Sequence, residues 1–199
     1  MTGIASQVEK FRRISIQGAC IDLVPYVPDY ALTVVRLRNL PDVRYFLNQE
    51  IESTLDLQET WYENYAKRDD DIFWVLKDKS GIVVGCNRIY DMYPKVLEKG
   101  SLIVDPDFGR SLPIALEADL LALQFAFFEI GVGTVITRTR DDNIKMQSIN
   151  SRFGFKETGQ EILRGVPYLV YSLTKEDFSP EPFESIIKHW SRRNERRKT

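Results

Sequence analysis

A long apolar helix followed closely by a β-branched strand is the feature that most constrains the fold of this chain. Residues 113–131 carry apolar side chains at alternating steps of four and three, which predicts a helix with one face packed on a sheet. The positions of this stripe are Ile114, Ala118, Leu121, Phe125 and Phe128. Gly131-Val132-Gly133 ends the helix, and residues 134–138, rich in β-branched side chains, predict a strand. Helix and strand in this order indicate an α/β domain.

Similar patterns predict further strands and helices along the chain. The expected strands are residues 14–24, 72–77, 82–90, 100–104, 155–163 and 168–173. The expected helices are residues 30–39, stopped by Pro41, residues 56–67 and residues 143–152. The chain has 199 residues, of which 43% are hydrophobic and 28% charged, a balance typical of one domain with a sizeable core. We expect this domain to span residues 1–177.

Residues 178–199 are expected to form a basic helical extension beyond the domain. After Pro180 and Pro182 the pattern predicts an amphipathic helix, and the chain ends in a run of basic residues at 192–198. The apolar side of this helix would carry Phe183, Ile186, Ile187 and Trp190. That side could pack on the domain or on a second copy of the chain in a homodimer, and the basic end could contact an anionic partner.

Composition argues against several function classes. The net charge of −2 and the pI of about 5.6 do not demand nucleic acid or an anionic membrane as a partner. No apolar run approaches the ~20 residues that span a bilayer, and residues 1–13 lack the apolar centre of a signal peptide. We therefore expect a cytoplasmic protein without a membrane partner, and nucleic acid is not an expected ligand.

Metal-binding residues are scarce in this sequence. The two cysteines, Cys20 and Cys86, are too few and too far apart for a zinc site and are expected to be buried thiols. A single histidine, His189, makes histidine triads and histidine metal clusters improbable. We expect no metal site.

The loop before the apolar helix has the features of an anion site. It reads Arg110-Ser111-Leu112-Pro113-Ile114-Ala115. Backbone N–H groups at a helix start lack intrahelical partners and lie at the positive end of the helix dipole, so they bind anions. Pro113 removes one of these donors, which weakens such a site without abolishing it. The loop taken alone also fits an ordinary helix start with proline in the first turn.

The order of these features resembles the core of the GCN5-related N-acetyltransferases (GNAT family). It comprises a strand end, a basic loop, an apolar helix, a strand, and Asn143 leading to Gly154-Phe155. The resemblance covers about residues 15–174. It implies the GNAT fold, a mixed and mostly antiparallel sheet of about six to seven strands flanked by helices. It also implies acetyl-coenzyme A as co-substrate, with its pyrophosphate on the 110–115 loop, and transfer of the acetyl group to an amine.

Two positions depart from the family pattern. Pro113 stands where the first glycine of the phosphate loop is expected, and Asn150 stands where many members carry a tyrosine that protonates the departing thiolate. Asparagine cannot give up a proton at neutral pH, so another group or water takes that role, or the thiolate needs little help. Asn143 is expected to contact the coenzyme, to cap the following helix, or both. These departures support an alternative, a catalytically silent member that binds a ligand or a protein.

The resemblance also places the reacting groups. Backbone N–H groups of Leu102, Ile103 and Val104 would polarise the thioester carbonyl where this strand splays from its neighbour. Glu98 is the predicted general base, because related enzymes often carry a glutamate at this place. Its alternative is a solvated glutamate at a strand end beside Lys95 and Lys99. Asp91 and Tyr93 are the reserve candidates.

The acceptor side resembles one branch of the family. Residues 35–44, followed by Gln58 and Trp61, look like the branch that acetylates amino sugars on nucleotide carriers or ribosomal-protein amino termini. The expected acceptor is a small-molecule amine, first of all an amino sugar and in some cases a nucleotide-linked one. The residues expected to bind it are Arg38, Asn39, Trp61, Tyr90 and Asp91. A solvated arginine face and an aromatic core stripe would explain the same residues without a ligand.

Overall fold

One mixed sheet forms the centre of the molecule. The structure is a computed structural model and describes residues 5–93, 95–109 and 113–198. Eight strands lie in the order β1-β2-β3-β4-β5-β6-β8-β7, and all neighbours are antiparallel except β5 and β6. The strands are β1 (Ile16–Gln17), β2 (Ile21–Pro25), β3 (Ile72–Asp78), β4 (Val83–Tyr90), β5 (Val96–Val104), β6 (Thr134–Arg140), β7 (Lys156–Leu163) and β8 (Val166–Thr174). The predicted α/β fold with a mostly antiparallel sheet is confirmed.

The sheet has one strand more than the upper end of the expected range, because residues 14–24 form two strands instead of one. The Gly18 N–H donates to the Ile21 carbonyl over 3.0 Å and closes the turn between β1 and β2. A Cβ atom on Gly18 would lie 2.5 Å from that carbonyl oxygen and 2.7 Å from a carboxylate oxygen of Glu117. Only glycine therefore fits this turn without displacing its neighbours.

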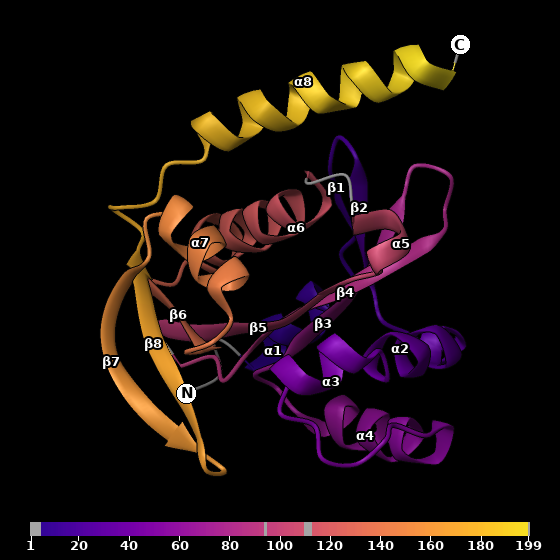
Figure 1. Cartoon of the computed structure of the whole chain (residues 1–199), viewed down its shortest axis with the longest axis vertical. Coiled ribbons are helices and arrows are strands. Elements are labelled where there is room, and N and C mark those ends of the chain that lie inside the picture. Colours follow the sequence, from indigo (N-terminus) through magenta and orange to yellow (C-terminus); the bar gives the residue numbers. More distant parts are fainter. Residues whose placement is uncertain (1–4, 94, 110–112, 199) are drawn as a thin grey trace.

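Helices cover both faces of the sheet, with α2, α3 and α4 on one face and α6, α7 and α8 on the other (Figure 1). The helical segments are α1 (Ala5–Phe11), the 3-10 turn η1 (Pro28–Tyr30), α2 (Ala31–Arg38), α3 (Pro41–Phe46), α4 (Leu55–Lys67), α5 (Pro106–Gly109), α6 (Pro113–Gln124), the π-helix η2 (Phe125–Ile130), α7 (Ile144–Arg152) and α8 (Glu181–Lys198). Successive residues of β3 serve opposite faces: Phe73 and Val75 join the core under α2 and α4, whereas Trp74 and Leu76 join the core under α6.

Three elements differ from their predicted form. Pro41 begins α3 instead of only ending the preceding helix, because proline suits the first position of a helix. β5 starts at Val96 rather than at residue 100, which places Glu98 inside a strand. Phe128 is 54% exposed, although its spacing predicted a buried position. The wider turns of the π-helix, in which the Gly131 N–H donates to the Ala126 carbonyl, rotate Phe128 away from the sheet.

The C-terminal helix packs on the domain of its own chain. α8 runs along the outer side of α6 (Figure 1), and Phe183 and Ile187 are buried in the same core as α6. The rings of Phe183 and Phe153 stack with their centroids 4.1 Å apart. Ile186 is 45% exposed, so it does not pack on the domain of its own chain. Within the described residues, no helix has the length and apolar character needed to cross a membrane.

Candidate active site

The parallel strands β5 and β6 diverge within the sheet. They pair only at three positions, of which Glu98 opposite Ile136 is the last. Beyond Glu98, β5 continues along β4 as far as Val104, while β6 continues along β8 as far as Arg140. In the described structure, the backbone of residues 102–104 therefore has no strand partner on its β6 side. This opening is a place where backbone N–H groups can meet a ligand.

A β-bulge bends β5 at this opening. Cys86 pairs with Ile103 and Arg88 with Gly100, so Asn87 faces two residues of β5, Ser101 and Leu102. Ser101 has a φ of 54°, in the left-handed region that non-glycine residues rarely adopt. An extra residue of this kind bends its strand and locally increases the twist. The bulge thus directs the 102–104 backbone away from β6.

The helix α6 is tied to the sheet beside the bulge. The Asn87 side-chain amide donates to the Ala118 carbonyl over 3.1 Å, and the Lys99 ammonium pairs with the Asp119 carboxylate at 2.7 Å. Both members of this ion pair are buried. The adjacent Glu117 carboxylate accepts three backbone N–H groups from the β1–β2 turn. Three consecutive residues of α6 therefore fix the helix relative to the β1–β2 turn, β4 and β5.

The start of α6 is the predicted site for the pyrophosphate. Arg110, Ser111 and Leu112 lie outside the described residues. α6 begins at Pro113, and Ile114 and Ala115 follow in its first turn. The described part of the predicted loop is thus a helix start, and the pyrophosphate contact stays a prediction.

Glu98 is buried and doubly bound, so the alternative of a solvated glutamate is wrong. The Tyr90 hydroxyl donates to one of its carboxylate oxygens over 2.9 Å, and the Arg138 guanidinium pairs with the other. Arg138 is itself held by Glu161 at 2.8 Å. Burial raises the pKa of Glu98 above its ordinary value, against the lowering effects of the Tyr90 hydrogen bond and the Arg138 charge.

The two reserve candidates for the general base are more exposed to solvent than Glu98. Asp91 pairs with the Arg68 guanidinium at 2.7 Å, and its side chain is 47% exposed. Tyr93 is 67% exposed. Of the three predicted base candidates, Glu98 alone is buried.

A cavity of about 280 Å³ lies on the face covered by α2 and α4. Its lining residues are Val34, Arg38, Ser53, Leu57, Gln58, Trp61, Phe73, Arg88 and Ser101. Ser101 places the cavity at the bulge. Arg88 places it near Glu98, because Arg88 and Tyr90 point to the same face of β4, ~7 Å apart along the strand, and Tyr90 pairs with Glu98. The cavity therefore lies beside the opening between β5 and β6.

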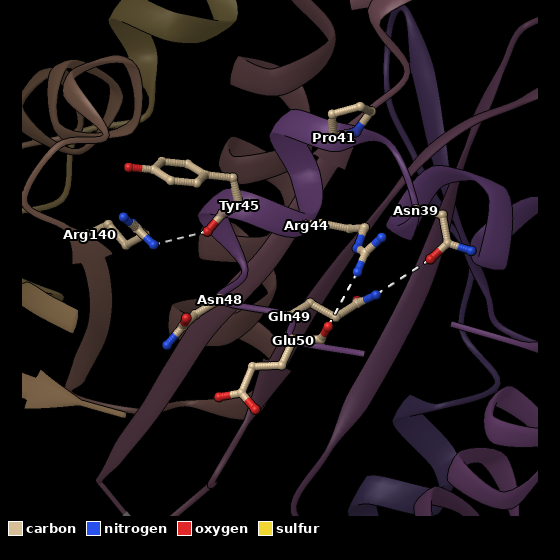
Figure 2. Close-up of a pocket in the computed structure, with 8 residues that line it drawn as sticks. All are labelled: Asn39, Pro41, Arg44, Tyr45, Asn48, Gln49, Glu50 and Arg140. Atoms are coloured by element: carbon tan, nitrogen blue, oxygen red, sulfur yellow. Dashed lines mark hydrogen bonds between the residues drawn. The ribbon is translucent and has the colours of Figure 1, made fainter. Parts of the chain in front are cut away.

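The predicted neighbours Arg38 and Asn39 face different cavities. The Asn39 side chain accepts the Ser53 N–H and donates to the Ser53 carbonyl, each over 2.8 Å, which fixes the chain before α4. It lines a second, more open cavity of about 420 Å³ together with Arg44, Tyr45 and Arg140 (Figure 2). The structure therefore brings Arg38 and Trp61 together, and it separates Asn39 from them.

The two predicted asparagine contacts differ in exposure. Asn143 caps α7, with its side chain accepting the Met146 N–H over 3.1 Å, so the capping role is confirmed. Asn150 is fully buried and donates to the Thr139 hydroxyl over 3.0 Å. Its side-chain oxygen has no hydrogen-bond partner among the described residues. Coenzyme contacts by either residue remain predictions.

Sequence reasoning missed three residues of this site. Arg138 lies 40 positions from Glu98 in the chain, and only the pairing of β5 with β6 brings them together. Arg88 is two residues before the predicted Tyr90, so alternation along β4 could have placed it on the same face. Nothing in the sequence pattern marks Ser101 as the bulged residue. Among the described residues, no group of histidine, cysteine and carboxylate side chains could hold a metal ion.

Comparison with known proteins agrees with this geometry. A family model for an acetyltransferase (GNAT) domain matches residues 21–156. A GCN5-related N-acetyltransferase from Brucella melitensis is similar with a TM-score of 0.73 and 22% identity, over 90% of this chain and 86% of that one. FdhC, a nucleotide-linked sugar GNAT, is similar with a TM-score of 0.70 and 20% identity, over 82% of this chain and 92% of that one.

A third similar structure was solved with ligands. Spermidine N-acetyltransferase from Vibrio cholerae, in complex with CoA and spermine, has a TM-score of 0.72 and 14% identity, over 80% of this chain and 98% of that one. No curated protein sequence matches this chain. At these identities the solved structures establish the fold, whereas the family model covers more than half of the chain. The chain therefore belongs to the GNAT family of acetyltransferases.

Proposed function

We propose that this protein transfers the acetyl group of acetyl-coenzyme A to the amine of a small metabolite. The observation that carries the proposal is the opening between β5 and β6 just beyond Glu98, with the bulge at Ser101 beside it. Successive N–H groups of a strand point to opposite sides, so a thioester carbonyl in this opening would meet those N–H groups of residues 102–104 that point away from β4. Such donors stabilise the negative charge that develops on the carbonyl oxygen during amine attack.

The coenzyme would lie along the opening, with its pyrophosphate at the start of α6. The proposed contacts there are the backbone amides of residues 111–115 other than Pro113, together with the side chain of Arg110. Asn143 and Asn150 at α7 complete the proposed coenzyme site. The ties between α6 and the sheet, such as the buried Lys99–Asp119 pair, would hold the two parts of this site in a fixed relation.

The reaction requires a neutral amine. The nitrogen attacks the thioester carbon, the new C–N bond forms, the C–S bond breaks, and the sulfur leaves as a thiolate. Glu98 is the proposed base that accepts the proton of the amine. Tyr90 binds one carboxylate oxygen of Glu98 and Arg138 binds the other. A carboxylate has about four lone-pair sites, so Glu98 can still accept a proton from the amine. We assign protonation of the thiolate to water, because Asn150 is buried and not acidic.

An amino sugar is the acceptor class that we propose to test first. Trp61 lines the cavity next to the bulge, and an indole face is suited to packing on a sugar ring. One similar structure is a nucleotide-linked sugar GNAT. We further propose a cytoplasmic location, which suits two free cysteines that form no disulfide.

The proposal is tested by incubating the protein with acetyl-coenzyme A and a panel of amines, and by detecting acetylated products by mass spectrometry. This readout avoids thiol reagents, which would also report Cys20. Calorimetry with coenzyme A is run in parallel. Coenzyme binding without any acetylated product would favour the silent binding module that Pro113 and Asn150 suggest. Absence of binding at millimolar coenzyme A would overturn the proposal.

A further inference from the structure

Arg38, the last residue of α2, has no counter-ion among the described residues. No described carboxylate pairs with it, and no described group accepts a hydrogen bond from it. Its neighbours on the same face differ in this respect, because Arg36 pairs with Asp105 and Arg88 binds both oxygens of Asp71. Burial lowers the pKa of Arg38, but an arginine keeps its charge. Arg38 is half-buried and none of its nitrogens is enclosed, so its charge remains accessible to a ligand.

The cavity lined by Arg38 carries this charge uncompensated. None of its lining residues is acidic, and the second lining guanidinium, Arg88, is neutralised by Asp71. The cavity therefore presents about one net positive charge to a ligand. A polycation such as spermine, which one similar enzyme binds, would be repelled here. An anion would gain both the charge and the two-pronged donor geometry of the guanidinium.

The charge and the size of the cavity together limit which class of anion can bind there. A cavity of about 280 Å³ is at the small end for ligand sites. A carboxylate brings one negative charge, which matches Arg38, whereas a phosphate monoester brings about −1.5 to −2 near neutral pH. Ser101 places the cavity at the bulge, beside the opening in which the proposed transfer takes place.

We propose that the acceptor is a compact amine bearing one carboxylate, and that Arg38 binds this carboxylate while the amine faces the opening between β5 and β6. This inference rests on the proposed acetyl transfer. It refines that function, because it excludes polyamines and makes a neutral amino sugar a poorer acceptor than its carboxylated counterpart.

The test compares three related acceptors, namely glucosamine, glucosaminate and glucosamine phosphate, with the wild-type protein and with Arg38→Met. Wild type should show the lowest KM for glucosaminate. Arg38→Met should raise that KM by about 10–100-fold, the loss expected for one charge-assisted pair, and change the KM for glucosamine by a much smaller factor. Arg38→Lys keeps the charge but not the two-pronged donor geometry, so its KM for glucosaminate should lie between those of wild type and Arg38→Met. Arg13→Gln, at an exposed arginine paired with Glu9, is the matched control.

A second measurement does not depend on turnover. Arg38→Met replaces a half-buried side chain without a described partner, so the melting temperature of the free protein should stay close to that of wild type. At constant ionic strength, glucosaminate should stabilise wild type more than glucosamine does, and this difference should vanish in Arg38→Met.

Three results would overturn the inference. They are equal effects of Arg38→Met on the KM of charged and neutral acceptors, equal stabilisation of wild type by glucosaminate and glucosamine, or a larger effect of Arg44→Gln, which would move the anion to the cavity of Figure 2. The proposed function fails separately: if no acceptor is acetylated and coenzyme A does not bind, the thermal comparison still decides whether Arg38 holds a carboxylate.

Discussion

At the scale of single residues, the central question is how Glu98 can act as a base while it is bound by Tyr90 and Arg138. Burial favours the protonated carboxyl and Arg138 favours the carboxylate, and burial has the larger effect, because the pKa of Glu98 is raised. A raised pKa brings a carboxylate closer to the pH at which enzymes usually work, which suits general base catalysis.

This assignment predicts the behaviour of Glu98→Gln. A base must be ionised, so the rate of wild type should fall as the pH drops through the raised pKa of Glu98. Glutamine cannot accept the proton, and kcat/KM should decrease by about 100-fold or more while the acidic limb of the pH profile flattens. Coenzyme A affinity, measured by calorimetry, should stay the same. If Asp91→Asn flattens the limb and Glu98→Gln does not, the base is Asp91.

At the scale of elements, the buried pair Lys99–Asp119 joins β5 to α6 across the core. Removing one partner leaves an unpaired buried charge, so Asp119→Leu should lower the free energy of unfolding by about 3–5 kcal/mol. The double variant Lys99→Met with Asp119→Leu removes both charges and should recover most of that loss. Denaturant unfolding of Lys99→Met, Asp119→Leu and the double variant measures these free energies of unfolding. Additive losses in the double variant would show that the two charges do not depend on each other.

The same elements show how far the sequence predicts the structure. Sequence pattern identified α6, β3, β4, β6 and β8, which contribute buried residues to the core, and also β7, although β7 is exposed along almost its whole length. It missed the division of residues 14–24, which depends on contact between Gly18 and Glu117, a residue of α6 about a hundred positions away. Glu98 was found by resemblance, but its burial required Arg138 and Tyr90 from neighbouring strands. Contacts between residues that are far apart in the sequence cannot be predicted from a local sequence pattern.

At the scale of the whole molecule, the two faces of the sheet hold different parts of the proposed active site. The α6 face holds the larger core and the proposed coenzyme site, and the face with α2 and α4 holds the Arg38 cavity. The opening between β5 and β6 lies in the sheet that separates these two faces. A transferred group could therefore reach an amine on one face while the coenzyme body stays on the other.

The helix α8 extends the core of the α6 face, and its contribution to stability can be separated position by position. Phe183 is buried and stacks on Phe153, so Phe183→Ala removes a large apolar side chain from a packed site and should cost about 3–5 kcal/mol in the free energy of unfolding. Ile186, three residues further along the same helix, is 45% exposed, and Ile186→Ala should change the stability by about 0.5 kcal/mol or less. Both variants keep the length and the basic end of the chain, so chemical denaturation monitored by circular dichroism compares packing alone. Equal small effects at the two positions would show that α8 does not rest on α6 in solution, and its apolar side would then be free to cover a second copy of the chain.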